Sequence, residues 1–106
     1  MVETRRALDN LDDILAVEGI DGVFVGPFDL SINLSGGKVG GANAPDVQAA
    51  LPKIAEAAAK AGKISGIYAS GHDEASRFQS LGFNLVSAAG DAAILATGAK
   101  AVLDGL

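Results

Sequence analysis

The sequence predicts an α/β fold built from parallel βα units, and two observations lead to this prediction. Short apolar runs alternate along the chain with longer segments in which apolar residues recur every three to four positions. The short runs do not alternate polar and apolar residues, which is typical of parallel strands that are covered on both faces. A regular succession of strands and helices of this kind forms a parallel sheet with right-handed crossovers.

The first part of the chain contains one helix, one strand and a long loop. Residues 5–17 carry an apolar stripe with helical spacing and end at Glu18-Gly19. Residues 23–25 form a short apolar run between two glycines, and this pattern predicts a buried strand. We interpret residues 1–3 as the stub of an earlier strand. Residues 32–45 contain five of the glycines and prolines and no periodicity, so we expect a long loop there.

The second part continues the alternation. A helix is expected over residues 46–61, with a kink or a late start near Pro52 because proline lacks the amide hydrogen. The segments that follow predict, in order, a strand at 64–68, a short helix after His72-Asp73, a strand at 83–87 and a last helix that opens at Asp91. About four βα units therefore span residues 1–106.

Four such units are half of a TIM-type (β/α)8 barrel, which usually takes about 250 residues. The single expected domain, residues 1–106, is thus half of such a barrel. A half-barrel exposes two strand edges and an apolar layer, which a water-soluble chain rarely tolerates alone. We therefore expect either a homo-oligomer or a partner polypeptide that supplies the other half.

Composition excludes several classes of protein. The chain is 49% hydrophobic and 20% charged, so it forms a packed core and is not disordered. Its net charge of -5 and the absence of a basic stripe argue against a nucleic-acid partner. It has no cysteine, so any metal must be bound by oxygen or by the one histidine. No signal peptide or membrane span is recognisable, which makes a cytoplasmic location the default expectation.

Two carboxylates follow the first two expected strands. Glu3 ends the first strand stub and Asp29 comes soon after residues 23–25. Neighbouring parallel strands end at the same edge of a sheet, about 4.8 Å apart, so two acids there can chelate one hard cation. The alternative is that Glu3 is a frayed terminal residue and Asp29 caps a local turn.

The amino-acid sequences of three segments resemble those of one protein family. Residues 21–31, DGVFVGPFDLS, are similar to the DGVFIGPADLS signature of the HpcH/HpaI aldolases. Residues 3–11 resemble that family's IETxxALxNLDDI segment, and residues 82–91 resemble its last strand and turn. The resemblance covers nearly the whole chain but only the second, C-terminal half of the family's barrel, so the N-terminal half is missing.

This resemblance implies a metal-dependent lyase of the pyruvate aldolase type. Glu3 and Asp29 would bind magnesium, manganese or cobalt, and the cation would act as a Lewis acid on a bound 2-oxo acid. Backbone N–H groups of Phe28 and Asp29 would bind the carboxylate of pyruvate. The implied reaction cleaves or forms 4-hydroxy-2-oxo acids, with a small 2-oxo acid and an aldehyde as substrates.

The chain also departs from the family. A glutamine common in the family would fall on Met1, and the family's catalytic histidine and arginine belong to the first half of its barrel. No catalytic residue is therefore assigned, and we expect the chain alone to be nearly inactive. Two alternatives stay open: a non-catalytic half-barrel or interaction module, and a related CoA-ester lyase.

Two further features of the sequence are less specific signals of function. His72, the single histidine, is expected in a loop on the active face, where it either touches substrate or serves as a solvated or helix-capping residue. The glycine-rich residues 35–41 do not lead from a strand into a phosphate-binding helix start, so we interpret them as a mobile loop beside the active site.

Overall fold

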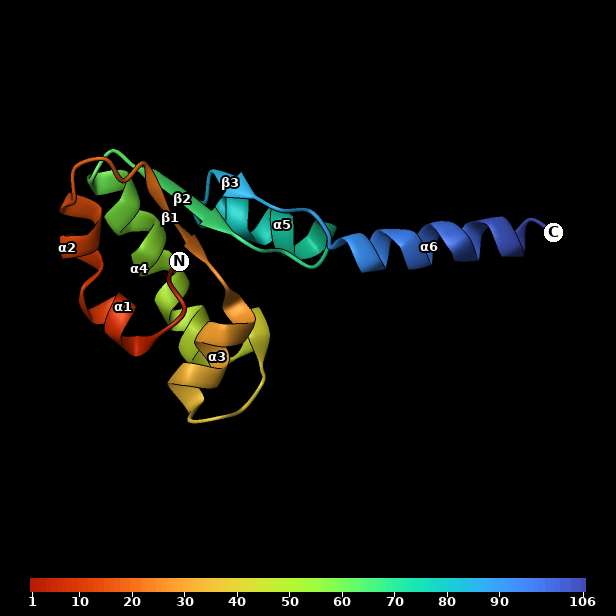
Figure 1. Cartoon of the computed structure of the whole chain (residues 1–106), viewed down its shortest axis with the longest axis horizontal. Helices are drawn as coiled ribbons and strands as arrows, with labels where there is room; N and C mark the ends of the chain where they lie inside the picture. Colours follow the sequence, from red (N-terminus) through yellow and green to blue (C-terminus); the bar gives the residue numbers. More distant parts are fainter.

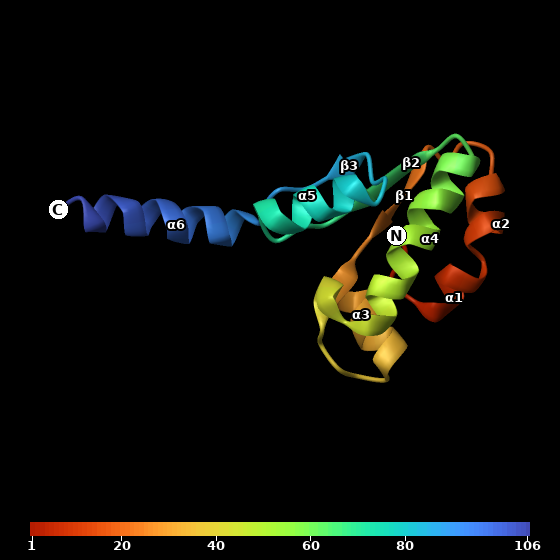
Figure 2. The same cartoon turned by 180° about the vertical axis from the view of Figure 1, so that it is seen from behind.

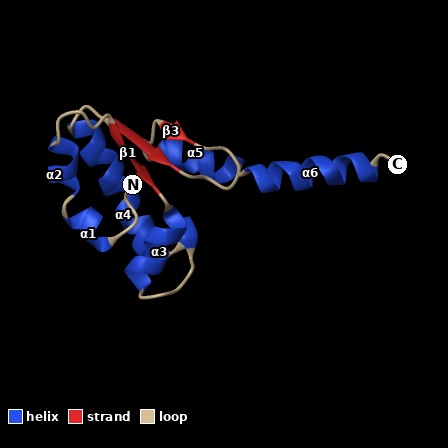
Figure 3. Ribbon diagram, in the orientation of Figure 1, coloured by secondary structure: helices blue, strands red, loops and turns tan.

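The computed structural model describes all residues, 1–106, and confirms the α/β class (Figures 1 and 3). Helices and short strands alternate from the N-terminus to the C-terminus. The elements in chain order are α1 (Arg5–Asp9), α2 (Leu11–Ala16), β1 (Gly22–Val25), α3 (Pro27–Ser35), the 3-10 turn η1 (Gly41–Asn43), α4 (Pro45–Lys60), β2 (Ile64–Ile67), α5 (His72–Ser80), β3 (Leu85–Val86) and α6 (Asp91–Asp104).

The three strands form one parallel sheet in the order β1-β2-β3. The expected strand stub at the N-terminus is reduced to a single parallel bridge between Val2 and Val25. Val2 nevertheless has no exposed surface, so the stub occupies the position of a fourth strand beside β1. Successive strands are neighbours and all run the same way, which is the topology of a parallel βα barrel segment.

The hydrophobic core lies between the sheet and its helices. Alternation along β1 leaves Val23 and Val25 buried on the helical side, and Ile67 of β2 is fully buried as well. Helix α4 lies along this side with its apolar stripe inward, including Val47 and Ile54, neither of which is exposed. Because consecutive right-handed crossovers place their helices on one face, the opposite face of the sheet carries no helix.

Residues 5–17 form two short helices and not the single helix expected. The break falls at Asn10, whose side-chain amide donates to the Arg6 carbonyl at 2.7 Å. Asparagine side chains compete with the backbone for such carbonyls and interrupt helices in this way. The apolar stripe survives the break, since Leu11 and Leu15 remain buried.

The prediction of a loop over residues 32–45 was wrong for its first and last parts. Residues up to Ser35 belong to α3, which starts with Pro27 at its first position and ends at Gly36 in the left-handed conformation with φ 75°. Proline is well suited to the first turn and glycine to this terminus, so the helix has strong signals at both ends. The loop without regular structure shrinks to residues 36–40.

Pro52 does not delay the start of the fourth helix. Helix α4 begins at Pro45, again with proline in the first turn, and continues through Pro52 to Lys60. Pro52 is exposed, while Leu51 and Ile54 on either side of it are buried, so packing of the apolar stripe outweighs the lost backbone hydrogen bond. The strand expected at 83–87 is only two residues long.

The sheet face without helices is apolar and open to solvent. Its register places Phe24 opposite Gly66 and Gly66 opposite Leu85, so these residues share one face. A Cβ at Gly66 would lie 2.5 Å from the Phe24 ring, which shows how closely this ring covers the neighbouring strand. Ile64 is 45% exposed and Leu85 54% exposed on the same face. In a closed barrel this is the surface that the remaining strands would cover.

Helix α6 projects from the rest of the molecule (Figures 1 and 2) and has no buried residue. Its projection stretches the molecule to 55 × 30 × 23 Å, with a radius of gyration of 15.5 Å against about 13 Å for a compact chain of this size. One stripe of this helix is apolar and more than half exposed, comprising Ile94, Leu95, Val102 and Leu103. None of the helices is both long and apolar enough to cross a bilayer.

We predict that this stripe contributes to self-association. Replacing Leu95 and Leu103 by glutamate should shift the chain toward smaller species in sedimentation velocity, because charge on an apolar contact surface opposes its burial. Thr97→Glu, which alters the same helix outside the stripe, serves as the control. Equal sedimentation of all three proteins would contradict the prediction.

Candidate active site

Three of the residues singled out by the sequence, Glu3, Phe28 and Asp29, belong to segments that meet at the end of β1, around Gly26. The Val2 N–H donates to the Phe24 carbonyl at 2.7 Å, which places Glu3 beside Gly26 on one side. The Tyr68 N–H donates to the Val25 carbonyl at 3.2 Å, which places Tyr68 beside Gly26 on the other. Gly26 is therefore flanked by the ends of two neighbouring strands, at the edge where parallel barrels hold their active sites.

The Glu3 carboxylate lies directly against Gly26. A Cβ at that position would collide with Glu3 Oε1, so a larger residue there would require the carboxylate to shift. Asp29 follows three residues later, in the exposed first turn of α3. The side chain of neither acid forms a hydrogen bond or salt bridge within the chain. Both carboxylates thus remain available as oxygen ligands at one strand-to-helix junction.

This donor set suits a hard divalent cation with an open coordination shell. No group of three or more histidine, aspartate or glutamate side chains gathers anywhere in the chain, so Glu3 and Asp29 would be its only acidic ligands. Magnesium and manganese accept one or two carboxylates and fill the remaining positions with water or substrate oxygens. The residues present therefore fit the cation that the sequence implied.

The backbone around Asp29 is suited to binding an anion. Phe28 and Asp29 occupy the second and third positions of α3, and the first intrahelical bond of the helix is donated by Leu30 to Gly26 at 2.9 Å. The N–H groups before Leu30 have no acceptor within the helix and point toward its N-terminal end, where the helix dipole favours negative charge. The acidic side chain of Asp29 in this turn also matches that dipole.

A buried serine holds the glycine-rich loop against the start of α3. The Ser31 hydroxyl donates to the Phe28 carbonyl at 2.7 Å and accepts the N–H groups of Gly40 and Gly41, both at 3.0 Å. Ser31 is only 1% exposed. Gly41 has φ 57°, and a Cβ there would lie 3.0 Å from the Phe28 ring, so both its conformation and its contact with Phe28 require glycine.

We predict that Ser31→Ala destabilises the chain by about 1–3 kcal/mol, because two backbone donors lose their acceptor. Chemical denaturation followed by circular dichroism would measure the change. Ser35→Ala is the matched control: Ser35 also accepts a loop N–H, that of Lys38 at 2.8 Å, but it is exposed. Equal stability of the two variants would contradict the prediction.

His72 is the first residue of α5 and is exposed, so it lies in a helix terminus and not in the loop expected. The same turn is organised by Glu74, whose carboxylate accepts the Ser70 N–H at 2.9 Å and the Ser70 hydroxyl at 2.6 Å. Partial burial raises the pKa of Glu74, but the two Ser70 hydrogen bonds and the nearby Arg77 charge outweigh it and lower the pKa. These contacts tie the segment after β2 to α5 without involving His72.

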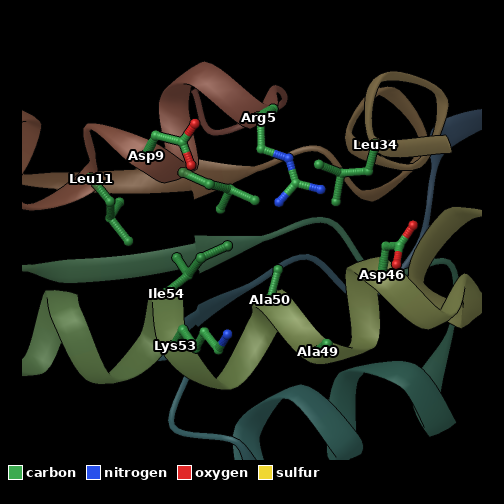
Figure 4. A pocket seen from close by; sticks show the side chains of 10 residues that line it. Arg5, Asp9, Leu11, Leu34, Asp46, Ala49, Ala50, Lys53 and Ile54 are labelled. Carbon is green, nitrogen blue, oxygen red and sulfur yellow. The ribbon is translucent and has the colours of Figure 1, made fainter. Parts of the chain in front are cut away.

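A separate groove of about 330 Å³ lies between α1, α3 and α4 on the helical side (Figure 4). Figure 4 shows Arg5 and Asp9 facing Ala50 and Ile54 of α4 across it. It contains none of the site residues expected from the sequence. Since active sites of parallel barrels lie at the carboxyl ends of the strands, this groove is not the candidate site.

Three contributors to the site had not been singled out from the sequence: Gly26, Ser31 and Tyr68. Gly26 and Ser31 lie within the 21–31 segment, so their place in the signature was the available signal. Tyr68 gave no such signal, because its position beside Gly26 follows from the pairing of β1 with β2.

Comparison with known proteins identifies the family of the chain. The model of the family described as HpcH/HpaI aldolase/citrate lyase matches residues 1–97. The chain is 41% identical over 103 residues to a hydroxypyruvate/pyruvate aldolase of Rhizorhabdus wittichii, with 97% of this chain and 41% of the relative covered. It is 43% identical over 101 residues to a 4-hydroxy-2-oxo-heptane-1,7-dioate aldolase of Klebsiella pneumoniae, with 95% of this chain and 37% of the relative covered.

A solved structure has the same fold. The crystal structure of an HpcH/HpaI aldolase/citrate lyase family protein from Burkholderia cenocepacia superposes with a TM-score of 0.88 at 32% sequence identity. The match covers 98% of this chain and 40% of that protein. This chain thus spans about two fifths of the length of the relatives it matches and has the fold of that part of a TIM-type barrel.

Proposed function

Since the chain belongs to the HpcH/HpaI aldolase/citrate lyase family, we propose that it supplies the metal-binding and 2-oxo-acid-binding part of an aldolase. The reaction is the reversible cleavage of a 4-hydroxy-2-oxo acid to pyruvate and an aldehyde. The observation that carries this proposal is the Glu3 carboxylate lying against Gly26, three residues before Asp29 in the N-terminal turn of α3. Relatives named as aldolases of 2-oxo acids support it.

Each element of the junction has a role in this proposal. Glu3 and Asp29 hold a divalent cation, and the N–H groups of Phe28 and Asp29 donate to the substrate carboxylate. When bound, the cation supplies Lewis acidity toward the 2-oxo group of the substrate. Gly26 keeps space for Glu3, and Ser31 fixes the turn that carries the donors. Preorganised donors of this kind stabilise charge that develops during the reaction.

Proton transfer requires groups from outside the chain. The chain has one histidine, which is exposed at the start of α5 and forms none of the hydrogen bonds that organise the junction. We propose that further βα units complete the barrel, cover the open apolar face of the sheet and contribute the acid–base residues. The apolar surface around Phe24 and Leu85 supports such an arrangement.

An assay on the completed barrel tests the proposal. The chain would be co-expressed with the part of the Klebsiella relative that it does not match, and pyruvate release would be followed with lactate dehydrogenase and NADH. We expect release that depends on manganese and stops on chelation. Cleavage of a CoA ester without pyruvate release would favour the alternative lyase, and a folded assembly with no lyase activity would favour a non-catalytic module.

A further inference from the structure

We propose that Phe28 and Tyr68 form an aromatic wall that receives the part of the substrate beyond its 2-oxo acid group. By this inference the enzyme prefers flat apolar groups to carboxylates at that end of the substrate. The inference rests on the proposed function, because the position of the 2-oxo acid defines which surface the rest of the substrate meets.

The two aromatic residues belong to the segments that meet at Gly26. Phe28 immediately precedes Asp29 in the first turn of α3, and Tyr68 follows β2 directly beside Gly26. The ring centroids are 6.3 Å apart with an interplanar angle of 53°, within the range of favourable aromatic pairs. Glu3 flanks Gly26 on the opposite side from Tyr68. A 2-oxo acid bound by Glu3 and Asp29 would therefore have the aromatic pair beside it.

The Phe28 ring is fixed in place although it is 48% exposed. On one side it packs against Gly41, where even a Cβ would lie only 3.0 Å away, and Ser31 holds Gly41 and the Phe28 carbonyl through hydrogen bonds. On the other side lies the Tyr68 ring. A half-exposed ring that is held so firmly beside a polar site presents a preformed apolar surface to a ligand.

Two glycines lie against the aromatic wall and add no charged side chain to it. The residues in contact with the two rings include Gly41 and Gly90, with a Cβ at Gly90 lying 3.2 Å from the Tyr68 hydroxyl. Neither glycine offers a donor side chain to a second carboxylate of the substrate, whereas both rings offer apolar surface to a flat apolar group. The signature that this segment resembles has alanine in place of Phe28, so the wall distinguishes this chain from that pattern.

Binding of unreactive 2-oxo acids to the full chain tests the wall. Calorimetry in manganese would compare pyruvate, 2-oxo-4-phenylbutanoate and 2-oxopentanedioate. We expect the phenyl acid to bind about five- to tenfold more tightly than the dioate, as one aromatic contact allows. Phe28→Ala should reduce this ratio to about twofold or less, and Phe28→Arg should invert it by pairing with the second carboxylate.

Control measurements distinguish a failure of the aromatic wall from a failure of the metal and 2-oxo acid site. Ile32→Ala removes another partly exposed apolar side chain of α3, one turn beyond Phe28, and should keep the parental ratio. Pyruvate binding with a ratio that neither Phe28 variant changes would overturn the wall and leave the proposed function intact. Absence of manganese-dependent pyruvate binding would overturn both. Inversion by Phe28→Arg would support the wall, since loss of folding cannot invert a preference.

Discussion

Alone, the 106-residue chain is expected to release pyruvate about 10²–10⁴-fold more slowly than the same chain assembled into a complete barrel. The chain holds carboxylates and backbone donors for the 2-oxo acid but has no histidine at the Gly26 junction. General acid–base groups typically contribute a factor of this size. The measurement is the coupled assay for pyruvate, performed with and without the complementary polypeptide.

A His72→Ala variant provides the control for this experiment. His72 is exposed and takes no part in the contacts that organise the junction, so the assembled variant should retain activity within about twofold of the parent. Full activity of the chain without its complement would refute the expectation. In that event a large loss in His72→Ala would identify this histidine as the proton-transfer group.

Asp29→Asn should weaken manganese binding by more than about 100-fold in calorimetric titration. The substitution removes one of only two acidic ligands, and carboxylates are the strongest oxygen donors for such cations. Changes outside the ligand sphere already alter metal affinity by about 10–100-fold, so the loss of a ligand charge should exceed that range. Glu3→Gln should behave in the same way because its carboxylate lies at the same junction.

Asp21→Asn is the matched control for charge. Asp21 is an exposed acid directly before β1, at the opposite end of that strand from Gly26, and its replacement changes the net charge by the same amount. We expect its titration to match that of the parent. If Asp29→Asn and Asp21→Asn bind manganese equally well, Asp29 is not a ligand and the assignment of the site fails.

The sequence by itself determined the α/β alternation and the family. Apolar runs and helical stripes are local patterns, so the strands at 22–25 and 64–67 and the long helix α4 were predictable within a few residues. The placement of Glu3 and Asp29 near one sheet edge was also predictable, because parallel strands end at a common edge. The helix α3 was missed, although Pro27 and Gly36 were visible start and stop signals, because the glycines after it dominated the pattern.

Only the tertiary structure decided how the site is held together. The hydrogen bonds from Gly40 and Gly41 to Ser31, the contact of Glu3 with Gly26, and the pairing of Phe28 with Tyr68 join residues that are distant along the chain. No local pattern encodes such contacts, because they depend on strand register and on the path of a short loop. The exposed stripe of α6 is a similar case: its helical spacing is local, but whether anything packs against it depends on the surfaces that surround it.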